Sequence, residues 1–301
     1  MTQTFYSNGK LLLTGEYLVM DGSSGLAIPT KYGQSLTVMP SNKGGIQWKS
    51  LDHRGNVWFE FDFPSLHPYK TNTHNAIALK LVEILRTAAT LNPRFLANTI
   101  GAAVSTHLDF PRDWGLGTSS TLINNIAQWA EIDAFELLRK SFGGSGYDIA
   151  AAQNDGPILY TLEDKKPKVE TIALHWNFTT SLFFIHLNKK QDSKKGIALN
   201  DARNKNKDSD SKMMQILNEN LIKASSLETF ETVLSQHEIA ISTIMGLQPI
   251  KERLFPDYNG MIKSLGAWGG DFVLATGTTE QMDYFRRKGY ATIIPFAEMI
   301  K

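Results

Sequence analysis

Strand-like and helix-like segments alternate along this chain of 301 residues, and the alternation starts a second time near His175. Short apolar or alternating runs bounded by Gly, Pro, Asn and Ser predict strands, and apolar residues at helical spacing predict helices. The predicted strands are 10–14, 34–39, 46–49, 57–61, 100–108, 157–162, 181–187, 272–276 and 291–295. The predicted helices are 73–90, 119–129 capped by Ser119 or Ser120, 133–140 capped by Asp133, a short one after 146, 212–225, 229–245 and 279–288. This mixed order favours an α+β fold in two domains, 1–175 and 176–301.

Charge balance and the absence of cysteine exclude several classes of function. The 31 basic and 30 acidic residues nearly cancel, so we expect no nucleic-acid partner and no attraction to an anionic membrane. Without cysteine there is no disulfide, no thiolate metal site and no cysteine nucleophile, and the seven histidines show no metal-ligand spacing. The chain shows no leader pattern and no run of about 18 apolar residues. We therefore expect a cytoplasmic protein that recognises anions only through local features.

The segment with the most chemical information is 111–121, PRDWGLGTSST, between a predicted strand and a predicted helix. Glycines allow positive φ and close approach of a ligand, and a helix start presents unpaired N–H groups at the positive end of its dipole. Such a turn binds anions, and its hydroxyls add donors and a possible Mg²⁺ ligand. A plain tight turn with a serine cap explains the same pattern. The P-loop and dinucleotide fingerprints are both absent.

Two further segments suggest groups held at strand ends. Residues 9–22, GKLLLTGEYLVMDG, place a lysine at the start of an apolar strand, and for this segment alone an edge lysine that reaches solvent is the better explanation. Residues 263–276, KSLGAWGGDFVLAT, place clustered glycines before a buried strand. Such glycines permit close approach of a ligand or of another backbone, and a hairpin turn is the alternative.

Together, and in this order, the three segments resemble the motifs of the GHMP kinase superfamily, in particular its mevalonate and phosphomevalonate kinase branch. Residues 9–22 are similar to G-K-L-x-L-x-G-E-Y-x-V of phosphomevalonate kinases, and residues 144–150, GSGYDIA, to their G-S-G-x-D-x-A. The resemblance implies a ribosomal protein S5 domain 2-like N-terminal domain and a ferredoxin-like C-terminal domain. It also implies a kinase that uses ATP and Mg²⁺ to phosphorylate a mevalonate-like metabolite, with phosphomevalonate or mevalonate preferred.

The resemblance implies a role for each matching residue. Asp148 matches the base, or electrostatic partner, of the acceptor hydroxyl, and Lys10 matches the lysine near that aspartate and the transferred phosphoryl group. The implied ATP-binding residues are Gly115, Leu116, Gly117, Thr118, Ser119 and Ser120. The implied substrate-binding residues are Glu16, Tyr17, Ser145, Gly266, Ala267 and Gly269. Ser119 matches the serine that binds Mg²⁺ in the family. The third motif of the family stabilises the phosphate loop and borders the substrate.

The sequence also departs from the family pattern. Thr118 and Ser120-Thr121 replace the usual Ser and Ala-Ala, and Trp268 replaces a glycine, which would crowd the site unless the indole points outward. Only 28 residues separate Ser119 from Asp148, and the shortened stretch normally brings the glutamate that is the second Mg²⁺ ligand. Glu136 is the nearest candidate for that ligand, and the competing candidates are Glu131 and Asp133.

Several alternatives stay open. A decarboxylase of mevalonate diphosphate shares this fold, and a catalytically inactive relative that binds ATP or a metabolite would explain Trp268 and the shortened stretch. Residues 188–212 are polar and predict a solvated loop, although the lysines of 189–195 would attract a phosphorylated acceptor. The expected partner is a small-molecule substrate, and the expected assembly is a monomer or a homodimer.

Overall fold

The computed structural model describes residues 1–64, 73–97, 100–189, 200, 206–266 and 270–301. The chain forms two compact units that interleave along the sequence. Unit 1 comprises 1–9, 32–112 and 116–153, and unit 2 comprises 10–31, 113–115 and 154–301. This division differs from two contiguous domains, because the chain enters each unit several times. The boundary expected between residues 175 and 176 stays a prediction.

Strands from distant parts of the sequence form the sheet of unit 1. Its strands are the later residues of β2 (Gly25–Pro40), β3 (Gly45–Leu51), β4 (Val57–Phe63) and β5 (Gly101–Leu108), in the order β4-β3-β5-β2. β3 runs parallel to β5, whereas the β3–β4 and β2–β5 pairs are antiparallel. β1 (Gln3–Leu12) pairs with β2. The sheet is therefore mixed.

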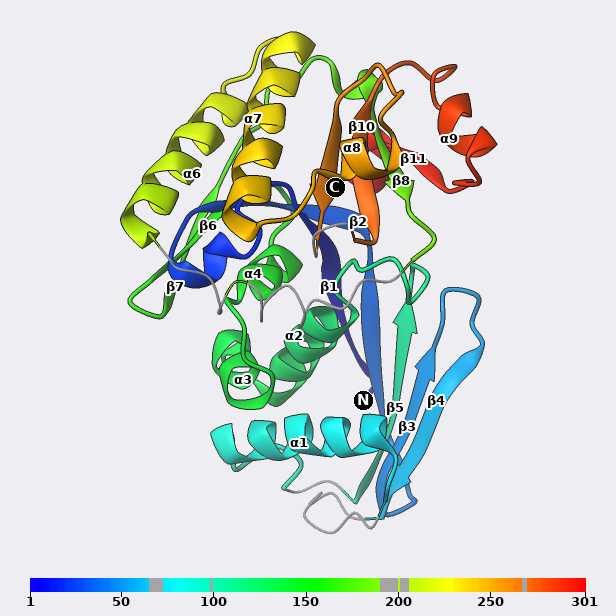
Figure 1. Cartoon of the computed structure of the whole chain (residues 1–301). Helices are drawn as coiled ribbons and strands as arrows, with labels where there is room; N and C mark the ends of the chain where they lie inside the picture. Colours follow the sequence, from blue (N-terminus) through cyan, green and yellow to red (C-terminus); the bar gives the residue numbers. More distant parts are fainter. Residues whose placement is uncertain (65–72, 98–99, 190–199, 201–205, 267–269) are drawn as a thin grey trace. The chain divides into compact units, whose positions relative to one another are not determined.

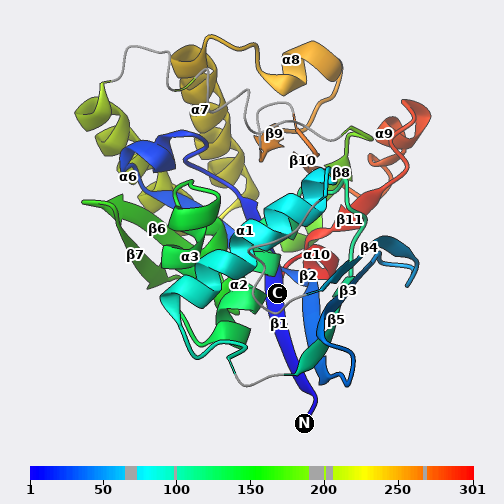
Figure 2. The ribbon, with the colours of Figure 1, turned by 90° about the horizontal axis from the view of Figure 1, so that it is seen from below.

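The described part of unit 1 also contains four helices, and α1, α2 and α3 gather on one side of these strands (Figures 1 and 2). The helices are α1 (Ala76–Leu91), α2 (Thr118–Ala130), α3 (Ala134–Ser141) and α4 (Tyr147–Gln153). Their apolar stripes and the inner face of the sheet share one buried core that includes Trp48, Leu85 and Ile126. Asp133 accepts hydrogen bonds from the N–H groups of Phe135 and Glu136, which confirms it as the cap of α3.

Unit 2 contains a four-stranded antiparallel sheet in the order β11-β8-β10-β9. The strands are β8 (Leu182–His186), β9 (Ile262–Leu265), β10 (Phe272–Thr276) and β11 (Ile293–Pro295). In the same unit the first residues of β2 pair with β6 (Ile158–Glu163), which pairs with β7 (Lys166–Thr171).

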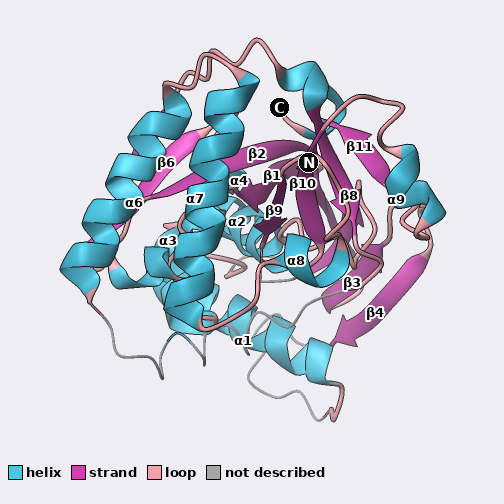
Figure 3. Cartoon of the chain, turned by 45° about the horizontal axis from the view of Figure 1, so that its top comes forward, coloured by secondary structure: helices cyan, strands magenta, loops and turns pink. Residues whose placement is uncertain are grey.

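The described helices of unit 2 differ widely in length. They are η1 (Leu18–Asp21), η2 (Thr179–Ser181), α6 (Lys207–Ile222), α7 (Leu227–Met245), α8 (Ile250–Leu254), α9 (Asp283–Arg287) and α10 (Phe296–Met299). The long helices α6 and α7 run side by side (Figure 3). Phe255 and Phe285 pack into the core that the four-stranded sheet shares with α8 and α9. Among the described residues, no helix combines the length and apolar character needed to cross a lipid bilayer.

The expected α+β class is confirmed by the mixed sheet of unit 1 and the antiparallel sheet of unit 2. The prediction that Ser119 or Ser120 caps α2 is wrong, because Gly117 is the N-cap and the helix begins at Thr118. Helix α9 is shorter than predicted, and strands β7 and β9 were not predicted. Much of 188–212 lies outside the described residues, and α6 already begins at Lys207.

Candidate active site

The glycine-rich turn of the second motif ends in the first turn of α2, within unit 1. Gly117 has φ 95° and ψ 41°, a left-handed conformation that favours glycine. The N–H groups of residues 117–120 donate to no acceptor in the part of the chain that the structure describes. They lie at the positive end of the helix dipole, an arrangement that suits phosphate oxygens.

The hydroxyl groups of this turn divide into two sets. Ser120 Oγ donates to the carbonyl O of Gly117 at 2.9 Å, Thr121 Oγ1 donates to Gln34 Oε1 at 2.7 Å, and both side chains are buried. Ser119 is exposed, and within the described residues its hydroxyl has no hydrogen-bond partner. Ser119 can therefore offer a ligand its side chain, whereas Ser120 can offer only its N–H. Leu116 is also buried, so only its backbone is available.

Residues of all three motifs meet around Gly115 in unit 2. Lys10 Nζ donates to the carbonyl O of Gly115 at 3.0 Å. Gly115 has φ 66°, and a Cβ at this position would lie 1.9 Å from Asp271 Oδ2. A Cβ at Gly266, where φ is 71°, would lie 3.7 Å from the same oxygen. The Asp271 carboxylate thus packs against both glycines, and Lys10 holds the chain two residues before the N-cap of α2.

Glu16 lies in a buried cluster of charges in unit 2 with Lys263 and Glu238. Lys263 Nζ donates to Glu16 Oε1 and lies 3.2 Å from Glu238 Oε2. Burial raises the pKa of Glu16 to about 7, although the charge of Lys263 opposes this shift. Burial alone would lower the pKa of Lys263, but the two carboxylates outweigh it and raise that pKa. The carboxylate of Glu16 is therefore engaged inside the unit, and its role in substrate binding stays a prediction.

His237, on α7, completes this cluster. The N–H of Gly15 donates to His237 Nε2 at 3.0 Å, so that nitrogen is unprotonated and the neutral ring carries its proton on Nδ1. Among the described residues, neither His237 Nδ1 nor Glu16 Oε2 has a hydrogen-bond partner, and Oε2 lies 3.3 Å from Nε2. Burial, assisted by the charge of Lys263, lowers the pKa of His237 well below its usual value. A neutral His237 thus anchors the backbone of the first motif beside Tyr17, which is buried and has φ 61°.

Asp148 stands in the first turn of α4, within unit 1. Gly146, with φ 90°, precedes the helix, and Asp148 Oδ1 accepts from the N–H of Ile149 at 3.1 Å. Both Asp148 and Ser145 are half-buried. Helix α4 packs against α2, so the proposed base and the phosphate-binding turn belong to neighbouring helices of one unit.

The three candidates for a second Mg²⁺ ligand have different surroundings. Glu136 is partly exposed, and its Oε1 lies 3.0 Å from Lys140 Nζ and 3.7 Å from Arg139 Nη2. Asp133 caps α3, and Glu131 is exposed at the end of α2 with φ 54°. No group of three or more acidic or histidine side chains suited to a metal occurs among the described residues. The metal role of Glu136 stays a prediction.

Some predicted residues lie outside the described part of the chain. These are Ala267, Trp268 and Gly269 of the third motif and the basic residues from Lys190 to Lys195. In contrast, the structure adds three residues for which no role was predicted, Lys263, Asp271 and His237. The available signal for Lys263 was a lysine followed by Ser-Leu-Gly and a buried strand, but its partner Glu16 lies 247 positions away.

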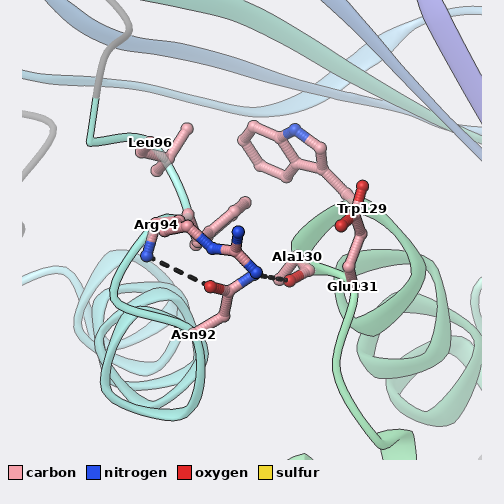
Figure 4. A pocket seen from close by; sticks show the side chains of 7 residues that line it. Asn92, Arg94, Leu96, Trp129, Ala130 and Glu131 are labelled. Carbon is pink, nitrogen blue, oxygen red and sulfur yellow. Dashed lines mark hydrogen bonds between the residues drawn. The ribbon is translucent and has the colours of Figure 1, made fainter.

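A pocket of about 320 Å³ lies in unit 1 at the C-terminal ends of α1 and α2 (Figure 4). Asn92 Nδ2 donates to the carbonyl O of Ala130 at 2.8 Å, and both residues line the pocket together with Arg94, Trp129 and Glu131. Since α2 spans 13 residues, or roughly 20 Å, this pocket is at the opposite end of the helix from Gly117. It is therefore separate from the phosphate-binding turn.

Comparison with solved structures identifies the fold. The mevalonate kinase of Methanococcus jannaschii matches with a TM-score of 0.70 and 13% identity, covering 98% of this chain and 97% of that one. The phosphomevalonate kinase of Streptococcus pneumoniae matches with a TM-score of 0.66 and 14% identity, covering 96% and 95%. A mevalonate diphosphate decarboxylase from Legionella pneumophila matches with a TM-score of 0.61 and 13% identity, covering 98% and 100%. No protein-family profile and no curated sequence matches. These structural matches show that the chain has the fold of the GHMP kinase superfamily.

Proposed function

We propose that this protein is a small-molecule kinase that transfers the terminal phosphoryl group of ATP to a mevalonate-like acceptor. The observation on which this proposal depends is the start of α2, where the N–H groups of residues 117–120 and the hydroxyl of Ser119 are free of partners in the described chain. The fold, shared with kinases of mevalonate and phosphomevalonate, supports it.

The donors at this turn fit a nucleotide polyphosphate. Backbone N–H groups at a helix start bind phosphate oxygens without a positive side chain, and Lys10 adds a positive charge to the segment that leads into the turn. Ser119 would contribute a hard oxygen ligand to Mg²⁺, which takes oxygen ligands and keeps several waters. When bound, Mg²⁺ would neutralise charge on the phosphates.

Asp148 is the proposed acceptor of the proton from the substrate hydroxyl. Phosphoryl transfer depends mainly on positioning and charge neutralisation, and a carboxylate at the acceptor oxygen adds about 10²–10⁴-fold. The acceptor we favour is phosphomevalonate or mevalonate, because Glu16-Tyr17 resembles the phosphomevalonate kinase pattern. ATP and Mg²⁺ are the proposed cofactors, and the proposed location is the cytoplasm.

The alternative function is that of a mevalonate diphosphate decarboxylase. One structural match carries that name, and it covers as much of this chain as the mevalonate kinase match does. An inactive relative is a further alternative, and the presence of both Lys10 and Asp148 disfavours it, because a protein that only binds ATP needs no base.

The test is ADP formation from ATP with a panel of acceptors, mevalonate, phosphomevalonate, mevalonate diphosphate, homoserine and galactose, each with and without Mg²⁺. The proposal expects Mg²⁺-dependent ADP with mevalonate or phosphomevalonate and no carbon dioxide. Asp148→Asn should retain nucleotide binding and lose at least about 10²-fold in turnover. Carbon dioxide release with mevalonate diphosphate would instead establish the decarboxylase, and nucleotide binding without turnover of any acceptor would establish the inactive relative.

A further inference from the structure

A chain of buried hydrogen bonds connects the first turn of α2 to the sheet of unit 1. Thr121 Oγ1 donates to Gln34 Oε1 at 2.7 Å and also lies 3.0 Å from the carbonyl O of Gly117. Asn125 Nδ2, one turn further along α2, donates to the carbonyl O of Gln34 at 2.8 Å. Asn125 Oδ1 in turn accepts from Ser7 Oγ of β1 at 2.7 Å. Strand β1, through Ser7, and strand β2, through Gln34, therefore both hold α2 by hydrogen bonds.

The same chain continues from α2 to α4. Asn124 Nδ2 donates to Ser7 Oγ at 2.8 Å, and Asn124 Oδ1 accepts from Gln153 Nε2 at 2.9 Å. Gln153 is the last residue of α4, the seven-residue helix that carries Asp148 in its first turn. One connected set of hydrogen bonds thus runs from the N-cap carbonyl of the phosphate-binding turn to the helix of the proposed base.

The five inner members of this set are almost inaccessible to solvent, since Ser7, Thr121, Asn124, Asn125 and Gln34 are at most 2% exposed. A buried polar side chain lowers stability unless it is hydrogen-bonded, and here each of these side chains has a partner. Apolar side chains could fill the same space without that requirement. What the polar chain adds is orientation, because a hydrogen bond weakens as its angle departs from linear, whereas the burial of apolar surface has no preferred direction.

We propose that this set, the α2–α4 network (Ser7, Gln34, Thr121, Asn124, Asn125 and Gln153), positions the phosphate-binding turn and the helix of Asp148 relative to each other for catalysis. Its members are positioning residues, since none of them is proposed to touch ATP or the acceptor. The inference rests on the proposed kinase function for its kinetic consequence. The family that this chain resembles usually has alanine at the position of Thr121, so the hydrogen bond from Thr121 to Gln34 is a feature of this chain.

The two ends of the network should have different kinetic effects. Thr121→Val removes the hydrogen bond to Gln34 and frees the turn. The nucleotide dissociation constant of this variant should rise about tenfold, because small misplacements of a binding group are costly. Thr121→Ser keeps the hydroxyl and should stay within about twofold of the parent. Thr90→Val is the matched control, because within the described residues Thr90 Oγ1 bonds only to the carbonyl O of Arg86, on the exposed face of α1.

At the other end, Gln153→Glu replaces the donor to Asn124 with an acceptor of the same shape. This change should lower kcat about tenfold and leave the nucleotide dissociation constant within about twofold, because only α4 is released. Gln128→Glu, on the exposed side of α2, is the matched control. Equal effects of Thr121→Val and Gln153→Glu on both constants would overturn the assignment of two separate ends.

Amide hydrogen exchange tests the network independently of activity. The N–H of Thr121 donates to the carbonyl O of Gly117, and that of Ala150 donates to the carbonyl O of Gly146, so each reports opening of its own helix. Thr121→Val should accelerate exchange at Ala150, and Gln153→Glu should accelerate it at Thr121, each at least about threefold under native conditions.

A purely local role would change exchange only in the substituted helix, and that result overturns the proposal. If no acceptor yields ADP while both cross-effects appear, the kinase assignment fails and the coupling of α2 to α4 stands. If Thr121→Val does not fold, Gln34→Met removes the same hydrogen bond from the side of the sheet and is judged by the same exchange at Ala150.

Discussion

Lys263 Nζ donates a hydrogen bond to Glu16 Oε1 inside unit 2, between two side chains that solvent barely reaches. The pair joins β9 to the loop after β1, and Glu238 and His237 of α7 surround it. Removing one member of a buried ion pair leaves the other charge in a medium that solvates it poorly. The relationship therefore makes the first and third motifs depend on each other for stability.

Lys263→Met should lower the free energy of unfolding by about 3–5 kcal/mol, because Glu16 and Glu238 would remain buried without their cation. Urea denaturation at pH 7.5 measures this change. The control is Lys168→Met, which removes a lysine paired with Glu163 at an exposed site and should change stability little. A Lys263→Met variant as stable as this control would contradict the structural role of the pair.

The stability of the chain should depend on pH through Glu16. Because burial raises its folded-state pKa from the usual 4.5 to about 7, the folded chain binds this proton more tightly than the unfolded chain. The resulting contribution to stability is present below about pH 4.5 and is lost as the pH rises through about 7. His237 acts in the opposite direction, because its pKa is lowered from 6.5 and stability falls as the pH falls below that value.

Glu16→Gln isolates this contribution from that of His237. Relative to the variant, the parent should lose about 3 kcal/mol of stability between pH 4.5 and pH 7.5, which urea denaturation at half-unit steps of pH measures. Glu163→Gln, at an exposed position, serves as the control. Parallel curves for the parent and Glu16→Gln would show that Glu16 has an ordinary pKa.

Gly115→Ala should weaken nucleotide binding at least about tenfold, because a Cβ at 1.9 Å from Asp271 Oδ2 displaces either the turn or the Asp271 side chain that packs against it. Gly246→Ala is the control, since Gly246 has a similar φ of 63° but open space around its missing side chain. Both glycines have a similar positive φ, so comparing the two variants separates the contact with Asp271 from the strain of a left-handed alanine. Isothermal titration with an ATP analogue checks this, and equal affinities in the two variants would count against the packing of Asp271 on the turn.

Ser119→Ala and Ser120→Ala should affect different properties. Ser119 is exposed and has no partner in the described chain, so its loss should raise the Mg²⁺ concentration needed for half-maximal activity by about tenfold. Ser120 bonds to Gly117, so its loss should lower stability by about 1 kcal/mol with little change in Mg²⁺ dependence. A Mg²⁺ titration and a denaturation curve for each variant measure the two effects, and a Ser119→Ala enzyme with unchanged Mg²⁺ dependence would exclude Ser119 as a ligand.

Periodicity and capping predicted most of the elements that position the site. The strand at 272–276 matches β10, and Asp133 caps α3 as predicted. The start of α2 was misplaced, because serine is a common N-cap and the left-handed conformation of Gly117 is a property of the turn as a whole. Local rules therefore gave the type of each element and were less accurate at its ends.

Strand β9 shows what local patterns cannot predict. All four of its residues are buried, yet the second is a lysine, which a periodicity argument assigns to solvent. Only pairing with Glu16, far away in sequence, makes a lysine acceptable there. The α2–α4 network is similar, because Asn and Gln in apolar surroundings become explicable only when their partners from other strands and helices are known.

Strands β1 and β2 each contribute residues to both compact units. A single cut in the polypeptide therefore cannot release either unit with all of its strands. A truncation within β1 or β2 would remove strand residues from both units and leave unpaired strand edges that favour aggregation. Insertions are accordingly best placed in the surface turns, such as the one around Gly55 between β3 and β4, where an added Cβ would meet no other atom within 4 Å.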